Sequence, residues 1–262
     1  LTLDDFRRVL VYPRAVVVAL LLQGLFLPLV CFAIAAGFGL KPAYAVGLML
    51  LAAAPGGIVA NLYSHLANGD VALNITLTAT NSLLSLFTLP LVVNLAMEYF
   101  MGVGQYVPLQ YSKVVQLFVI VLGPVGIGMV LRAKAPAFAA RVTRPFKIFS
   151  ILLLAVLIAA VTVKSKGELL NYFPQVGLAA LCFNVVILAV GYMVRQRIEV
   201  SRRQSIAIGM EIGIHNSTLA MAIALSPLML NNPEMAIPPA VYSVSMFLTA
   251  GAFAWWLNRK LA

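Results

Sequence analysis

The sequence predicts an all-α polytopic membrane protein, on three observations. First, 62% of the 262 residues are apolar and only 10% are charged, a composition typical of membrane proteins. Second, the apolar residues gather in long runs, and because a helix of about 20 residues crosses a bilayer, roughly eight crossings fit. Third, these runs are too long for barrel strands, and open sheets cannot span lipid.

The first three apolar runs follow a polar, basic lead-in at residues 1–12, and they cover about 13–36, 42–67 and 71–97. Pro55, Gly56 and Gly57 break the second run, because proline lacks an N–H donor and glycine frees the backbone to turn. A short turn that opens with Asn68-Gly69 leads into the third run, which must return antiparallel beside the second. We expect Asp70 to cap that third helix.

The third run is unusually polar for a membrane helix. It carries amides and hydroxyls at Asn74, Thr76, Thr78, Thr80, Asn81 and Ser82. A helix that faces only lipid would not carry such a density of polar groups. We therefore predict that this helix faces protein or a wet cavity.

Five further runs complete the predicted bundle. After a loop at 98–112, they cover about 113–131, 146–163, 168–194, 204–227 and 234–257. The sixth is plainly apolar, whereas an acid, an imidazole, an amide and hydroxyls interrupt the seventh between Gly209 and Ala220. The eighth ends at Trp255 and Trp256, residues typical of the membrane interface.

The basic residues indicate the orientation of these crossings. With eight alternating crossings, 14 of the 18 Lys and Arg residues fall on one side, and Lys41, Lys113, Lys164 and Lys166 fall on the other. The richer side is assigned to the cytoplasm, which places both ends of this chain inside and predicts a multi-pass protein of the cell (inner) membrane. The net charge of +10 then reflects topology, and we expect no nucleic-acid partner.

The two halves of the chain read as inverted copies of each other. Run one is uninterrupted, run two is broken and run three is lined by polar residues. Runs six to eight start on the opposite side of the membrane, and their second member is again broken. Inverted repeats with paired broken helices are typical of secondary transporters, whose site lies where the breaks meet. Full symmetry would require two more helices before residue 1. We therefore expect eight transmembrane helices of a ten-helix inverted-repeat fold with two crossing discontinuous helices.

Glu211 is the one acidic residue deep in an apolar run, and it predicts an ion site. A charged carboxylate at mid-membrane needs a cation or a proton, and no Lys or Arg lies at comparable depth. Asn61, Asn74 and Thr78 could add neutral oxygens of the kind that hard cations prefer. The alternatives are a structural Glu211 that is protonated or paired, and ordinary helix–helix hydrogen bonding by Asn74 and Thr78, which share a helix face.

The broken helices also predict an anion site. A break exposes the N–H groups of the second half-helix, and these attract anions. We expect a substrate carboxylate or sulfonate to meet these ends near Gly56, Gly57, Asn216 and Ser217, with Thr218 beside them. Asn216, Ser217 and Thr218 are also good caps for a half-helix.

Other reactive side chains carry weaker signals. His215, four residues after Glu211, could share its proton or bind a transition metal, but no further ligands cluster nearby. We expect His65 near the cytoplasmic membrane surface, and Cys31 and Cys182 as small buried hydrophobes. No His-Glu-x-x-His or hydrolase motif is present, so we expect neither an enzyme nor a cofactor.

Two motifs resemble the bile acid:sodium symporter family. The first is Ala54-Pro-Gly-Gly-x-x-x-Asn61 followed by Leu66-Ala-x-Gly-Asp-Val-Ala-Leu73, and the second is Glu211-Ile-Gly-x-x-Asn216-Ser-x-Leu-Ala220. The resemblance runs essentially the full length of the chain. It implies ten helices in two domains, with a core at 13–98 and 165–258 and part of a panel at 112–164.

The resemblance further implies two sodium sites. The first would use Asn61, Asn74, Thr78 and Glu211; the second would use Gln23, Glu211, the backbone carbonyls of Ile212 and Ile214, and the side chain of His215. Ala60 and Asn74 stand where the family usually has serines, and His215 stands where glutamine is usual. Because imidazole is a poor sodium ligand, coupling to one sodium ion, or to a proton carried by His215 with Glu211, stays an alternative.

The predicted function is sodium-coupled symport of an organic anion by alternating access, with the panel rocking against the core. The anion would be bile-acid-like, or a small carboxylate or sulfonate, and we expect a monomer in the lipid bilayer. A proton-coupled organic-anion carrier that uses Glu211 and His215 is the first alternative. A receptor, a channel or an intramembrane enzyme is the alternative from another class.

Overall fold

A computed structural model describes residues 10–104, 108–113 and 173–259, together with scattered residues between 115 and 145. In these residues regular structure is helical apart from one isolated bridge, as the sequence predicts. The predicted run at 146–163 and most of the run at 113–131, and with them most of the predicted panel, lie outside the described residues. Among the described helices, the continuous segments long and apolar enough to span a bilayer are Pro13–Gly37, Val71–Met101, Pro174–Gln196 and Pro233–Arg259.

The first span is one long helix that contains a π-helical turn. It consists of α2 (Pro13–Leu21), the turn η2 (Leu22–Phe26) and α3 (Leu27–Gly37). The turn holds one extra residue, a feature often found at functional sites, and the sequence did not predict it. Gln23 lies in this turn and is only 6% exposed. The wide turn therefore places an amide side chain inside the bundle.

The second run is broken at the predicted place. α4 (Pro42–Ala53) and α5 (Ile58–Leu66) are separated by extended backbone. Pro55 has no N–H with which to continue the helix, so α4 closes on the Ala54 amide, which donates to the carbonyls of Leu50 (3.1 Å) and Leu51 (3.0 Å).

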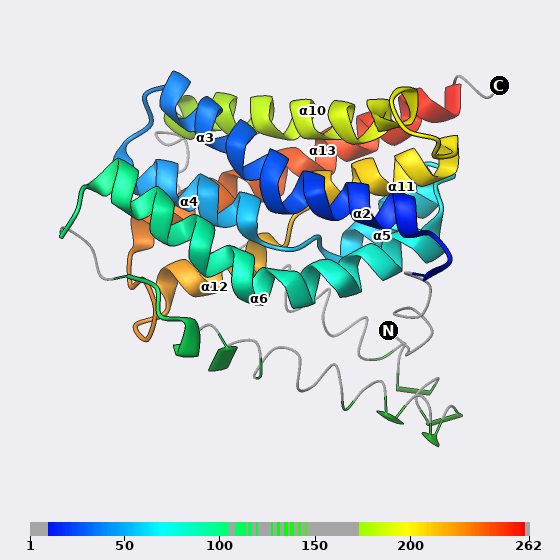
Figure 1. The fold of residues 1–262 in the computed structure, drawn as a ribbon, viewed down its shortest axis with the longest axis horizontal. Helices are drawn as coiled ribbons and strands as arrows, with labels where there is room; N and C mark the ends of the chain where they lie inside the picture. The colour runs from blue at the N-terminus through cyan, green and yellow to red at the C-terminus, as the bar shows by residue number, and fades with distance from the viewer. Residues whose placement is uncertain are drawn as a thin grey trace.

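The seventh run is also broken, between α11 (Arg202–Gly213) and α12 (Ser217–Leu225). Ile214 leaves the helical region (φ −117°, ψ 89°), and the Asn216 side chain caps α12 by accepting from the Leu219 amide at 3.0 Å. α4 and α12 share one end of the molecule, and α5 and α11 share the other (Figure 1). The two breaks therefore meet between the ends.

The third run forms α6 (Val71–Met101), and Asp70 caps it by accepting from the Leu73 amide at 3.0 Å. The predicted reason for its polarity is only partly right. Thr76, Thr80 and Ser82 each donate to the carbonyl four residues earlier, at 2.7–2.9 Å. These hydroxyls are satisfied by their own helix, so their presence does not require a wet cavity. Asn74 and Asn81, by contrast, are buried and lie at the functional site.

The remaining described elements pack around the broken helices. They are η3 (Phe173–Gly177), α10 (Leu178–Met193), η4 (Val194–Gln196), η5 (Pro233–Ala236) and α13 (Ile237–Arg259). α10 and α13 run side by side along one edge of the bundle (Figure 1). α10 also contacts α11 closely, because a Cβ atom on Gly191 would lie 2.6 Å from the Gly209 Cα. Small residues thus hold the half-helix α11 tightly against α10.

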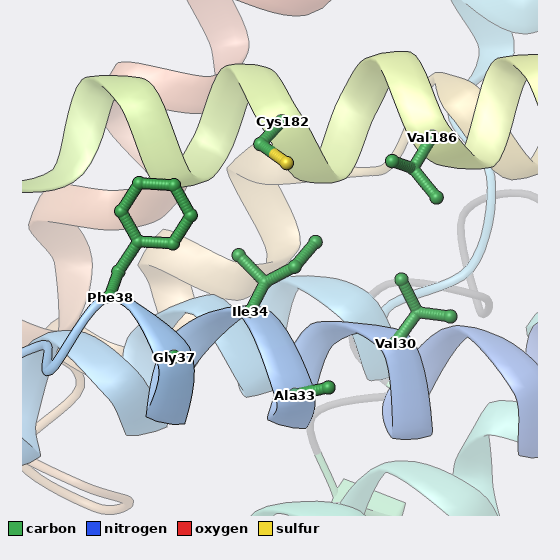
Figure 2. Close-up of a pocket in the computed structure, with 7 residues that line it drawn as sticks. All are labelled: Val30, Ala33, Ile34, Gly37, Phe38, Cys182 and Val186. Atoms are coloured by element: carbon green, nitrogen blue, oxygen red, sulfur yellow. The ribbon is translucent and has the colours of Figure 1, made fainter.

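An apolar groove of about 520 Å³ lies between α3 and α10. Figure 2 shows its lining, in which every side chain is apolar or a thiol: Val30, Ala33, Ile34, Gly37, Phe38, Cys182 and Val186. Cys182 is partly buried here and Cys31 is fully buried, and both are free thiols. Cys31 is therefore a small buried hydrophobe as predicted, whereas Cys182 is only partly buried and lines the groove.

Candidate functional site

The two helix breaks bind each other through their backbones, as the sequence predicts. The Gly57 amide donates to the Ile214 carbonyl at 2.8 Å, and the Asn216 amide donates to the Pro55 carbonyl at 2.9 Å. Gly56 and His215 face each other between these bonds as an antiparallel bridge. Backbone groups that each break would leave unpaired in the membrane therefore satisfy those of the other.

Glu211 lies fully buried beside this junction. Its carboxylate accepts from the Thr78 hydroxyl at 2.6 Å, from the Asn81 amide at 3.2 Å and from the Gly56 backbone amide. A Cβ atom on Gly56 would lie 2.2 Å from the Glu211 Oε1 atom, so only glycine lets the carboxylate approach this closely. Donors from α6 and from the first break thus converge on one carboxylate.

The helices α5 and α6, which both pack against α11, carry acceptors without a hydrogen-bond partner in the described part of the chain. The side-chain carbonyl oxygens of Asn61, Asn74 and Asn81 are buried and have no hydrogen-bond partner in the described part of the chain. The Asn74 amide nitrogen donates to the Ala207 carbonyl at 2.8 Å, which holds its oxygen in place. Unpaired buried acceptors are costly, and a hard cation coordinated by oxygens would satisfy them. The Glu211 carboxylate and these amide oxygens are ligands of the kind that sodium binds.

No cationic side chain neutralises this carboxylate among the residues that the structure describes. The ion pair found there joins Arg14 to Glu199 at the protein surface. No group of three or more His, Cys, Asp or Glu side chains gathers around a common point in the same residues, which does not favour a transition-metal centre. The weak metal reading of His215 therefore gains no support.

A second set of acceptors lies on the other side of the junction. Gln23 donates to the carbonyls of Ala52 (3.1 Å) and Ala54 (3.0 Å), and its own side-chain oxygen is buried without a partner in the described residues. Because the Asn216 amide donates to Pro55 instead of closing α11, no described amide bonds to the Ile212 carbonyl. The Ile214 carbonyl accepts one bond, from Gly57, and keeps a second lone pair.

His215 does not pair with Glu211, although four residues separate them. The helix ends between them, so the spacing that would place them on one helical face no longer applies. The imidazole is 1% exposed and stacks on Phe183 with ring centroids 5.9 Å apart and an interplanar angle of 16°. Both ring nitrogens lack a partner among the described residues. A shared proton between His215 and Glu211 therefore has no hydrogen bond to support it here.

The predicted anion-contact residues fall into two groups. The amides of Gly56 and Gly57 already donate to Glu211 and to Ile214, so they are occupied within the protein. Asn216 caps α12 and is partly exposed, and Thr218 is exposed. The Ser217 hydroxyl is buried and lies 4.0 Å from the Met246 sulfur.

The sequence did not predict that three residues lie near the functional site: Asn81, Asn184 and Tyr242. Asn81 follows Thr78 by one helical turn, and that spacing could have assigned it to Glu211. Asn184 is a buried amide in the run that was predicted to be plainly apolar, and it bonds to Tyr242 and to the Gly213 carbonyl. No local pattern marks that contact, because α10, α11 and α13 meet only in the folded chain.

Comparison with known proteins agrees with this geometry. The family model described as "Sodium Bile acid symporter family" matches residues 1–173. The chain is 30% identical over 263 residues to the "Probable sodium/metabolite cotransporter BASS2, chloroplastic" of Oryza sativa subsp. japonica, which covers 100% of this chain and 61% of the relative. It is 27% identical over 264 residues to the "Uncharacterized sodium-dependent transporter YocS" of Bacillus subtilis, covering 98% and 78% respectively. The "Ileal sodium/bile acid cotransporter" of Oryctolagus cuniculus matches 124 residues at 29% identity, which is 47% of this chain and 35% of that protein.

The match to the rice relative extends across both broken helices, whereas the family model covers the first. The chain spans about three fifths of the length of that relative. The described helices that are long and apolar enough to span a bilayer fit a multi-pass membrane protein, and the matched family is one of transporters, not of enzymes. The chain belongs to the sodium bile acid symporter family.

Proposed function

We propose that this protein is a sodium-coupled symporter of an organic anion that works by alternating access. The observation that carries the proposal is the buried Glu211 carboxylate at the junction of two broken helices, with unpaired amide oxygens on the adjoining helices α5 and α6. A first sodium ion would lie among Asn61, Asn74, Thr78 and Glu211. Sodium would supply the positive charge that the carboxylate lacks at this depth.

A second sodium ion would lie on the Gln23 side of the junction. Its ligands would be the Gln23 and Glu211 side chains and the carbonyls of Ile212 and Ile214, with His215 beside them. The unpaired Gln23 oxygen supports this site. The stacking of His215 on Phe183 makes its imidazole the weakest member of the set.

The anion would bind at the exposed start of α12. Thr218 and Asn216 are accessible there, and the N-terminal end of a half-helix favours negative charge. The carboxylate or sulfonate would be drawn to this end once sodium is bound. The proposal extends to an inverted repeat of two five-helix units, in which a panel domain rocks against the core in the cell membrane, with both ends of this chain cytoplasmic.

Uptake into proteoliposomes tests the proposed function. We expect a panel of radiolabelled organic anions to include at least one that accumulates under an inward sodium gradient and not under an equal potassium gradient. Glu211→Gln should abolish the sodium-dependent part, whereas Glu234→Gln, at an exposed carboxylate outside the site, should retain it. Sodium-independent accumulation by the wild type would contradict the proposal.

The proton-coupled alternative rests on His215, whose two buried ring nitrogens have no partner in the described chain. Under that alternative, uptake would follow an inward proton gradient in sodium-free buffer and would be lost in His215→Gln. Under sodium coupling, the same variant would restore the side chain that is usual in the family and retain sodium-driven uptake.

A further inference from the structure

A buried polar cluster holds the end of α11 at the second break. The Gly213 carbonyl, at the end of α11, accepts from the Asn184 amide of α10 at 2.7 Å and from the Tyr242 hydroxyl of α13 at 2.8 Å. The Asn184 amide also donates to the Tyr242 oxygen at 2.6 Å, and the Asn184 oxygen accepts from the Thr249 hydroxyl. Asn184 and Tyr242 are both fully buried.

The hydrogen bonds in this cluster are complete. The two amide hydrogens of Asn184 go to Gly213 and Tyr242, and the Tyr242 hydrogen goes to Gly213. A carbonyl oxygen has two lone pairs, so the Gly213 carbonyl is fully used. Closed polar networks in a low-dielectric interior hold their members rigidly. The Gly213 carbonyl is therefore held toward Asn184 and Tyr242.

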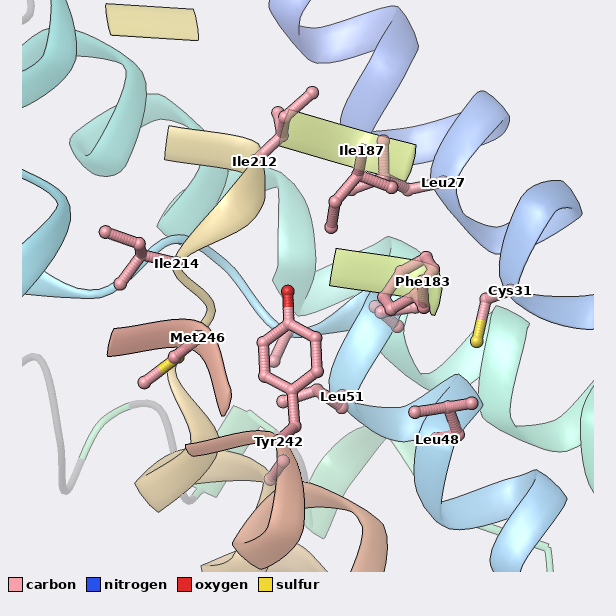
Figure 3. Packing of buried hydrophobic residues seen from close by; sticks show 14 of the residues in the cluster. Leu27, Cys31, Leu48, Leu51, Phe183, Ile187, Ile212, Ile214, Tyr242 and Met246 are labelled. Atoms are coloured by element: carbon pink, nitrogen blue, oxygen red, sulfur yellow. The ribbon is translucent and has the colours of Figure 1, made fainter. Parts of the chain in front are cut away.

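Gly213 sits between the two residues whose carbonyls we assign to the second sodium ion. Figure 3 shows the Tyr242 hydroxyl directed at the segment that joins Ile212 to Ile214. Fixing the Gly213 peptide restricts the peptide planes on either side of it, because neighbouring planes share a Cα atom. The Tyr242 ring also packs 5.7 Å from the His215 ring and 6.0 Å from Phe183, so the same residue supports the imidazole.

We infer that Asn184 and Tyr242 are positioning residues for the second sodium site. They donate hydrogen bonds to the Gly213 carbonyl and thereby orient the neighbouring carbonyls of Ile212 and Ile214 toward the ion. Neither Asn184 nor Tyr242 contacts the ion itself. The inference rests on the proposed sodium coupling. It requires that a change at Tyr242 alter sodium binding more than binding of the organic anion.

The test measures sodium binding directly, because it needs no identified substrate. The melting temperature of the purified protein in detergent is followed as sodium chloride replaces choline chloride at constant ionic strength. Tyr242→Phe removes the hydroxyl and keeps the ring. We expect its half-saturating sodium concentration to rise about fivefold, as the loss of one net hydrogen bond implies.

Tyr63→Phe is the matched control. It also removes a tyrosine hydroxyl that donates to a backbone carbonyl, that of Phe247 at 3.1 Å, between α5 and α13. We expect this control to lower the sodium-free melting temperature and to leave half-saturation by sodium unchanged. If Tyr242→Phe behaves in the same way, the cluster only stabilises the fold and the inference is wrong.

Thr249→Val gives an independent test of the inference, which can be used if Tyr242→Phe does not fold. It removes the hydroxyl that contacts the Asn184 oxygen and also the carbonyls of Ser245 and Met246, but it leaves both bonds to the Gly213 carbonyl in place. We therefore expect a smaller rise in half-saturation, about twofold. An unchanged value would overturn the inference. If sodium does not change the melting temperature of the wild type, the proposed function is wrong, and the inference with it. If sodium stabilises the wild type and both variants keep its half-saturating sodium concentration, the inference alone is wrong.

Discussion

Gly56→Ala should abolish sodium coupling while leaving the protein folded. The added methyl group would lie 2.2 Å from the Glu211 Oε1 atom and 2.4 Å from its Cδ atom. Because carbon and oxygen atoms do not approach this closely, the carboxylate must retreat by about 1 Å or more. The contacted atoms are the far end of a flexible side chain, so the displacement falls on Glu211 and not on the backbone.

The magnitude follows from the bonds that this displacement breaks. Glu211 accepts from Thr78 at 2.6 Å and from Asn81 at 3.2 Å, and a retreat of this size loses at least the longer bond and misaligns the other. Each hydrogen bond to a charged group contributes about 1.5–3 kcal/mol, so the two bonds to Glu211 together contribute about 3–6 kcal/mol. We expect sodium affinity to fall by at least about 100-fold.

Two assays separate loss of the site from loss of the fold. Sodium-dependent thermal stabilisation should disappear, and sodium-driven uptake should fall to background, while the sodium-free melting temperature changes by a few degrees only. Gly37→Ala is the control, since a Cβ atom there meets nothing within 4 Å. Retention of wild-type sodium affinity in Gly56→Ala would show that the Glu211 carboxylate is not held against Gly56, and the reasoning would fail.

Three further predictions concern the same scaffold. Asn81→Leu removes one donor to Glu211 and one unpaired oxygen, and calorimetric titration should show sodium affinity reduced about tenfold; an unchanged affinity would assign Asn81 a structural role. Gly191→Val forces a side chain into the Gly209 backbone, so overpacking should destabilise the protein by about 1–3 kcal/mol or more, seen as a lower melting temperature in sodium-free and sodium buffers alike. Asp70→Ala removes the cap of α6 and should cost about 1 kcal/mol in thermal unfolding, and Asp70→Asn should restore most of it.

Several site features follow from residues that are close in sequence. Pro55 ends α4 because it has no N–H, and Asn216 starts α12 because its side chain caps the new helix. The sequence also predicts that the two breaks meet, because paired broken helices in inverted repeats place the site where the breaks come together. The pairing of Gly57 with Ile214 confirms that prediction.

Other features depend on contacts between distant residues, and the sequence does not predict them. The π-helical turn that carries Gln23 contains Gly24 and is followed by Pro28, which has no N–H to donate to the Gly24 carbonyl. This pattern by itself does not separate a π-helical turn from a simple kink. The separation of His215 from Glu211 depends on the torsion angles of Ile214. Thr80 and Ser82 looked like cavity-lining groups, but their hydroxyls bond to their own helix.

The sequence by itself determined the membrane-spanning class, the order of the described helices, the position of both breaks and the carboxylate at their junction. These are local properties, set by apolar length, by the missing proline donor and by the cost of a charge in lipid. Only the tertiary structure decided which oxygens surround Glu211 and which residues hold the Gly213 carbonyl. Those contacts join α6, α10, α11 and α13 between residues that lie 29 to 133 positions apart, and no sequence period records the meeting of residues so far apart.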